Sequence, residues 1–120
     1  MSEQNNIDEN KDEMDELTQV SMNILLHAGN ARDNLVKSLK SIESENFEVA
    51  KDYLKKAKEE VTTSHEYQTK TLQKEASGEQ IRYSTLFAHA QDTMMIAQSE
   101  ILIAENLVKI FEKIMKKTWR

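Results

Sequence analysis

The sequence of 120 residues contains no cysteine and no proline, and it has only two glycines, Gly29 and Gly78. Without cysteine, the chain has no disulfides, no thiolate ligands for a metal and no cysteine nucleophile of its own. Folds rich in tight turns need many glycine and proline positions, so all-β architectures are disfavoured. No apolar run approaches the roughly 18 residues that a membrane-spanning helix needs. Alanine, leucine, lysine, glutamate and glutamine are plentiful, and these residues favour helices.

The charge of the chain is unevenly distributed. The net charge is −5, and residues 1–16 hold seven acidic residues against one lysine. This segment is polar and aperiodic, and it lacks the basic and then apolar start of a secretory signal. We therefore expect a disordered acidic tail at residues 1–11, a single domain over residues 12–120 and a cytoplasmic location. Nucleic-acid binding needs a concentrated basic face, so it is not expected.

Three long helices account for the rest of the chain. The first begins near Asp12 and ends at the polar stretch 41–46, where Asn46 is suited to cap the second helix. The second ends at Gly78, which is suited to a left-handed cap, and the third runs from about residues 81–84 to Lys117. Gly29 interrupts the first helix at a cost of about 1 kcal/mol relative to alanine, which predicts a close approach of another segment there.

The third predicted helix carries two seams, shifted by one residue, that keep the coiled-coil spacing for four heptads. The first seam is Phe87, Ala90, Met94, Ala97, Ile101, Ala104, Val108, Phe111 and Met115. The second seam is Leu86, His89, Thr93, Ile96, Glu100, Ile103, Leu107, Ile110 and Ile114. A hairpin of two helices covers one seam well, so the second indicates self-association. The predicted fold is an all-α, antiparallel up-down-up three-helix bundle that assembles further.

His89 and Asp92 are the candidate functional residues, because they lie one turn apart on a largely apolar face. A neutral imidazole can attack phosphorus and hold a phosphoryl group covalently. A histidine with satisfied hydrogen bonds in the core or an interface remains the alternative. Asp92 is either an exposed aspartate, a group that tunes the imidazole, or one of several copies around a cation. The histidines have no di-iron or zinc-protease spacing, and the sequence has no glycine-rich phosphate loop.

Three further features each allow two interpretations. On the second helix, Ser64, His65, Gln68 and Thr69 form either a satisfied polar layer or part of a site. Arg32 is either a residue at the rim of the core or a cation that binds phosphate. A basic cluster ends the chain and is either a solvated helix end or a docking patch for an acidic partner. The cluster consists of Lys109, Lys113, Lys116, Lys117 and Arg120.

Five stretches resemble, in the same order, motifs of the lactose/cellobiose class of enzyme IIA proteins of the bacterial sugar phosphotransferase system. They are Ala28-Gly29-Asn30-Ala31-Arg32, Asn46-Phe47, His65-Glu66-Tyr67-Gln68-Thr69, Glu75-Ala76-Ser77-Gly78-Glu79 and His89-Ala90-Gln91-Asp92. The resemblance covers nearly the whole chain after the tail. The family commonly has a second histidine after the aspartate, whereas this chain has Thr93.

The resemblance implies that His89 accepts a phosphoryl group from the carrier HPr and passes it to a cysteine of a cognate IIB component. The sugar would be of the lactose, cellobiose or chitobiose type, and the membrane would be reached only indirectly, through the IIC permease. The resemblance also implies a homotrimer with Asp92 of three subunits around a magnesium ion. The alternatives are a helical adaptor that binds partner helices, and a phosphotransfer domain of two-component signalling, whose His-x-x-Lys-Gly context is missing here.

Overall fold

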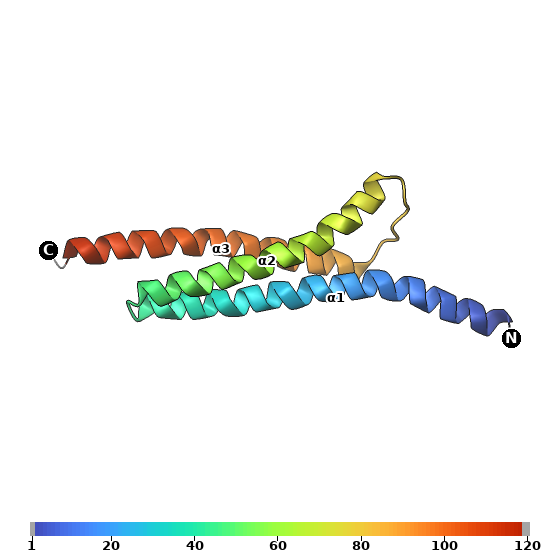
Figure 1. The fold of residues 1–120 in the computed structure, drawn as a ribbon, viewed down its shortest axis with the longest axis horizontal. Coiled ribbons are helices and arrows are strands. Elements are labelled where there is room, and N and C mark those ends of the chain that lie inside the picture. Colours follow the sequence, from blue (N-terminus) through green and yellow to red (C-terminus); the bar gives the residue numbers. More distant parts are fainter. Residues whose placement is uncertain (1, 119–120) are drawn as a thin grey trace.

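The computed structural model describes the backbone of residues 2–118 and the side chains of residues 16–117. It contains three helices, α1 (Ser2–Glu43), α2 (Phe47–Ala76) and α3 (Thr85–Thr118), and no strand within residues 2–118. Helices α1 and α2 form a hairpin, and α3 runs back in the direction of α1, so the molecule is long and narrow (Figure 1). Its extents are 78 × 27 × 18 Å. The predicted up-down-up bundle is confirmed.

The N-terminal part of α1 extends beyond the other two helices (Figure 1). The backbone of residues 2–11 continues the helix, and the side chains of residues 1–15 lie outside the described residues. The disordered tail at residues 1–11 and the domain boundary that follows it stay predictions.

The turn between α1 and α2 contains only Ser44, Glu45 and Asn46. Glu45 has a positive φ of 62°, and its N–H donates to the carbonyl of Ile42 at 2.9 Å. Asn46 accepts a hydrogen bond from the N–H of Val49 at 3.4 Å, which satisfies one of the free donors at the start of α2. The short hairpin and the Asn46 cap are therefore confirmed.

The first seam of α3 forms the core with the facing sides of α1 and α2. Small alanines alternate with larger side chains on all three helices, which lets the helix axes approach closely. The buried members on α3 are Ala90, Met94, Ala97, Ile101, Ala104 and Val108. They pack against Ile24, Ala28, Ala31 and Leu35 of α1, and against Ala50, Leu54, Ala57 and Val61 of α2. The structure confirms this predicted seam from Ala90 to Val108, whereas its later member Phe111 is 44% exposed.

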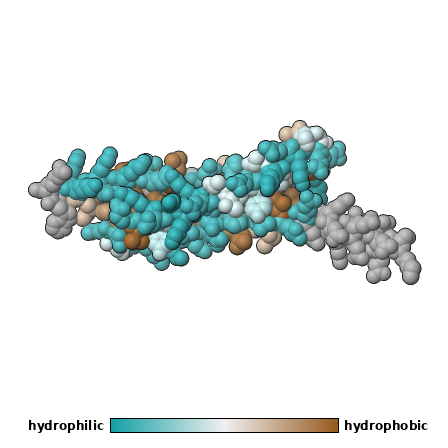
Figure 2. All heavy atoms as spheres, in the orientation of Figure 1, coloured by the Kyte–Doolittle hydropathy of each residue, from teal (hydrophilic) through white to brown (hydrophobic). Residues whose placement is uncertain are grey.

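The second seam of α3 stays uncovered in the single chain. Its residues Ile96, Ile103, Ile110 and Ile114 are each at least 50% exposed. On α1, Met22 and Val36 are about half exposed as well. Figure 2 shows such apolar groups as separate patches on a mostly hydrophilic surface. None of the three helices, as far as they are described, is long and apolar enough to cross a bilayer.

Gly29 lies half-buried in the middle of α1. A Cβ atom added there would meet nothing within 4 Å. The sequence predicts that another segment approaches Gly29 closely. No such approach is present within the single chain, so for the single chain that prediction is wrong.

Candidate functional site

His89 lies in the second turn of α3 and is exposed. The helix starts where the hydroxyl of Ser84 accepts a hydrogen bond from the N–H of Phe87 at 3.1 Å. One residue beyond His89, the fully buried Ala90 begins a contact with α1 that Met94 continues one turn later. Because these two side chains fix the inner face of the helix, the imidazole of His89 lies on its outer face.

The ring of His89 makes no hydrogen bond or ion pair with any side chain described between residues 16 and 117. Asp92, one turn later, is exposed as well and is not bonded to the imidazole. Thr93, where the family commonly has a second histidine, donates its hydroxyl to the carbonyl of His89 at 2.8 Å. The threonine thus bonds to the backbone rather than to the ring, and the imidazole stays open to an approaching partner.

Arg32 contacts a different part of α3. Its Nε lies 3.2 Å from Oε1 of Glu100, a buried atom that accepts no hydrogen bond within the described residues. Glu100 follows His89 by eleven residues, which is about 16 Å along the helix axis. The structure therefore does not bring Arg32 to His89 in one chain, and the arginine forms an ion pair that joins α1 to α3.

The polar patch of α2 is divided between the core and the surface. The buried hydroxyl of Ser64 donates to the carbonyl of Ile24 on α1 at 3.0 Å, which is a satisfied polar contact. His65 is exposed, and its Nδ1 lies 3.1 Å from the hydroxyl of Thr69. Gln68 is buried. No described contact joins this patch to the His89 region, so the polar layer is the interpretation that one chain supports.

A pair that the sequence reasoning missed joins α1 to α2. His27 Nδ1 lies 2.7 Å from Oε2 of Glu60, and its ring lies parallel to that of Tyr67 with centroids 6.0 Å apart. His27 and Glu60 lie 17 and 16 residues from Ser44, in the turn of the hairpin. Nearly equal spacing from a short turn is the signal that could have identified the pair.

One chain does not supply a complete metal site. No group of three or more histidine, aspartate or glutamate side chains in the described part of the chain could hold a metal ion. Asp92 contributes a single carboxylate from an exposed position. Carboxylate oxygens suit magnesium, so the chemistry fits this ion only where other copies add ligands. The magnesium site therefore stays a prediction.

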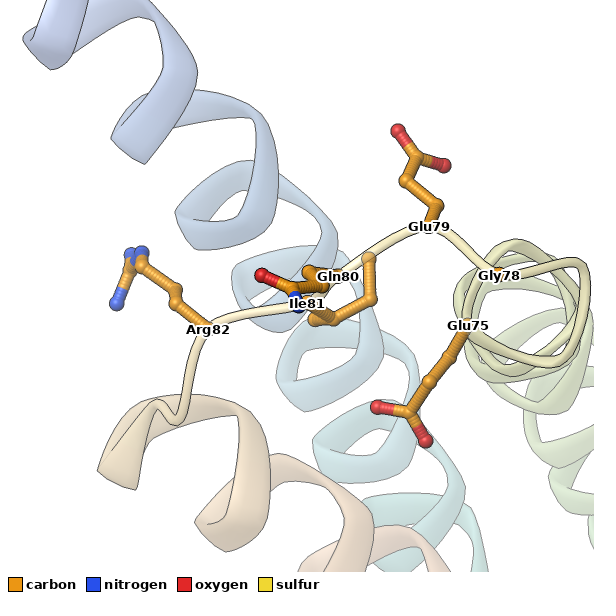
Figure 3. Close-up of a pocket in the computed structure, with 6 residues that line it drawn as sticks. All are labelled: Glu75, Gly78, Glu79, Gln80, Ile81 and Arg82. Atoms are coloured by element: carbon orange, nitrogen blue, oxygen red, sulfur yellow. The ribbon is translucent and has the colours of Figure 1, made fainter.

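The connection between α2 and α3 forms a shallow pocket that is separate from His89 (Figure 3). Gly78 has the left-handed φ of 101° that its predicted role as a cap requires. The charged side chains of Glu75, Glu79 and Arg82 point in different directions rather than toward a common centre (Figure 3). The pocket is lined by Glu75, Gly78, Glu79, Gln80, Ile81 and Arg82. No histidine lines it.

Residues 19–112 match the family model described as the lactose/cellobiose-specific IIA subunit of the PTS system. The chain is 34% identical over 103 residues to the lichenan-specific phosphotransferase enzyme IIA component of Bacillus subtilis, covering 86% of this chain and 94% of that protein. It is 32% identical over 99 residues to the lactose-specific EIIA component of Staphylococcus epidermidis, covering 82% and 95%. The PTS cellobiose-specific enzyme IIA of Bacillus anthracis has a similar crystal structure, with a TM-score of 0.80, 31% identity and coverage of 84% and 93%. The chain therefore belongs to the lactose/cellobiose-specific IIA family of the sugar phosphotransferase system.

Proposed function

We propose that His89 carries the phosphoryl group in this protein. Members of the IIA family are phosphotransferases, and the chain is a phosphoryl carrier of a sugar phosphotransferase system. The exposed imidazole of His89 supports the assignment, because the contact of Ala90 and Met94 with α1 fixes its helix while its ring stays free of bonds to other described side chains. The donor is the phosphohistidine of HPr, and the acceptor is a cysteine of the cognate IIB component.

Each transfer exchanges one bond to phosphorus for another. A ring nitrogen of neutral His89, expected to be Nε2, attacks the phosphorus of phospho-HPr in line with the bond that breaks. The proton lost from the second nitrogen of His89 balances the proton taken up by the departing imidazole. The thiolate of the IIB cysteine then attacks phosphorus, and His89 regains its proton as the N–P bond breaks. Positioning and charge stabilisation are the catalytic contributions.

The cations that stabilise the dianionic phosphoryl group do not come from the same chain as the His89 that carries it. Arg32 is held by Glu100 about 16 Å along α3 from His89, and no other described basic side chain contacts the imidazole. A partner protein or a second copy of the chain therefore supplies the positive charge.

The exposed isoleucines of the second seam, Ile96, Ile103 and Ile110, pack against copies of themselves in the proposed homotrimer, while His89 near the start of the seam stays accessible. Asp92 precedes Ile96 by four residues, and Ile103 and Ile110 continue the line at heptad spacing. Three Asp92 carboxylates that meet near the axis would repel one another unless a cation neutralises them. A magnesium ion held there would neutralise the three carboxylates and stabilise the trimer. The ion takes no part in the phosphoryl transfer, which His89 carries out.

The trimer is tested with Asp92→Asn. We expect that magnesium raises the melting temperature of the wild-type trimer and that the variant loses this dependence, because an amide carries no negative charge. Analytical ultracentrifugation and thermal unfolding with magnesium or with a chelator measure both effects. An axial ion is excluded if mass and melting behaviour are the same in all four conditions.

In this proposal, the class of transported sugar and the cellular location of the protein are assigned by analogy with its relatives. Relatives carry names for lichenan, lactose and N,N'-diacetylchitobiose. We therefore assign a sugar of the lactose, cellobiose or chitobiose type. The carrier works in the cytoplasm, where HPr and IIB reach His89, and the IIC permease completes the uptake.

The assignment of His89 is tested by labelling with phosphoenolpyruvate, enzyme I and HPr. We expect one acid-labile phosphate per chain in the wild type and none in His89→Gln. His65→Gln is the matched control, because His65 is also exposed but lies on α2. It should keep full labelling. Retained labelling in His89→Gln, or loss confined to His65→Gln, would place the phosphoryl group elsewhere.

A further inference from the structure

Tyr83 is a large aromatic residue that the fold leaves in water. It is 83% exposed, the highest fraction among the large hydrophobic residues that the structure describes. It belongs to neither seam of α3, because it precedes Thr85, the first residue of the helix, by two residues. The pocket beside it is lined by Ile81 and Arg82 but not by Tyr83. A ring that buries so little apolar surface contributes little to the stability of the bundle.

The backbone on both sides of Tyr83 is held by hydrogen bonds. The hydroxyl of Ser84 accepts from the N–H of Phe87 at 3.1 Å, and the carbonyl of Ser84 accepts from the N–H of Ala88 at 3.0 Å. Arg82 donates through Nη1 to the carbonyl of Tyr83 at 3.5 Å. A tyrosine has only two side-chain torsions, so a partner that covers a ring held in this way loses little free energy to ordering it.

The cap at the start of α3 sets the side of the helix on which Tyr83 lies. Ser84 caps the helix, and the residue before a cap lies over the fourth residue of the helix, where two apolar side chains often pack together. The fourth residue of α3 is Ala88, which directly precedes His89. Alanine is too small to cover a tyrosine ring. The ring of Tyr83 is therefore exposed on the side of the helix that adjoins His89.

Tyr83 lies within the area that a protein acting on His89 would cover. Two residues of extended chain span at most about 7 Å, and the four residues from Thr85 to His89 rise about 6 Å along the helix. The Cα atom of Tyr83 is therefore within about 13 Å of that of His89. A stable protein partner buries about 800 Å² on each side, which corresponds to a disc with a radius of about 16 Å. A partner centred on His89 thus reaches Tyr83.

We propose that Tyr83 is a recognition residue for the cognate IIB component, which takes the phosphoryl group from His89 in the proposed function on which this inference rests. Tyrosine is among the residues that contribute most to binding at protein interfaces. A cognate partner must be told apart from the IIB components of other systems, which suits a residue outside the motifs that family members share. Tyr83 lies between two such motifs, Glu75–Glu79 and His89–Asp92, and belongs to neither. The IIB component would present an apolar surface to the ring, beside its reactive cysteine.

The test measures phosphoryl transfer from the full-length, phosphorylated chain to the purified cognate IIB component. Tyr83→Ala should raise the KM for IIB about 30-fold and change kcat less than about threefold, because the ring binds the partner and does not act on phosphorus. Tyr83→Phe keeps the ring and should stay within about threefold of the wild type in both constants. Tyr53→Ala is the matched control, since Tyr53 lies on α2 between Lys37 and Lys56, and it should leave the KM unchanged. Phosphorylation of each variant by phospho-HPr should also be unchanged.

Titration calorimetry of the unphosphorylated chain with IIB gives a second readout that does not depend on His89. Tyr83→Ala should bind about 30-fold more weakly than the wild type. The proposal is overturned by an unchanged affinity and KM, by an equal loss in Tyr53→Ala, or by an equal loss with HPr, which would assign the surface to the donor. A lower mass of Tyr83→Ala in ultracentrifugation would also overturn it, because Tyr83 would then lie between copies of the chain. If the wild type accepts no phosphate but its binding to IIB still depends on Tyr83, only the proposed function fails.

Discussion

Two adjacent methionines of α3 give a direct test of how the helix is oriented. Met94 is fully buried against Ile24 and Ala28, whereas Met95 is 54% exposed. Truncation of a buried methionine to alanine costs about 2–5 kcal/mol, because it removes apolar contact and leaves a cavity. Met95 buries only about half of its surface, so the same change there should cost about 1 kcal/mol. The two variants should therefore differ by at least about 1 kcal/mol and more typically by about 2.

Urea unfolding followed by far-ultraviolet circular dichroism measures both variants on the same scale. Met94→Leu is the control for side-chain volume, and it should cost less than about 1.5 kcal/mol. The measurement should be repeated over a range of protein concentrations, since burial of Met95 between copies would raise its cost as the chains associate. Equal losses in the two alanine variants at every concentration would show that α3 is rotated away from the orientation described here.

Two electrostatic contacts between helices make separate predictions. Arg32→Met should lower the free energy of unfolding by up to about 1 kcal/mol in urea titrations, because it removes the ion pair of a half-exposed arginine with Glu100; an unchanged free energy of unfolding would show that the pair does not stabilise the contact between α1 and α3. The hydrogen bond from Lys51 is the main cause that lowers the pKa of Glu112. Since the folded pKa lies below the unfolded one, this stabilisation is present at neutral pH and is lost as the pH falls through the folded value. Unfolding of Glu112→Gln should therefore depend less on pH across the acid range than unfolding of the wild type, and identical profiles would exclude the Lys51 contact.

Much of the fold could be predicted because its determinants are local. Asn46 ends one helix and caps the next through its own side chain, and Gly78 adopts a φ that other residues rarely reach. The first seam of α3 follows from helical periodicity alone. The ion pair of Arg32 with Glu100 could not be predicted, because it depends on how two separate helices are rotated against each other.

The site could be predicted only in part. Periodicity placed His89 on the second seam of α3 but left its chemistry open, because the residues that react with it belong to other proteins. The family membership supplies the phosphoryl chemistry, and it decides against the adaptor and two-component alternatives. The bond of the Thr93 hydroxyl to the carbonyl of His89 became visible only in the structure, since a threonine hydroxyl has several acceptors within reach on a helix.

The last turns of α2 have a consequence for the motions of the molecule. From Leu72 to Gln80 every residue is exposed, and this end of α2 leaves the other helices (Figure 1). An exposed ion pair between Lys74 and Glu16, 2.9 Å apart, joins it to α1, and such pairs contribute little to stability. Amide hydrogens here should exchange through local opening, long before those beside Met94. We therefore expect a persistent bundle with one segment, the last turns of α2, that unfolds and refolds on its own.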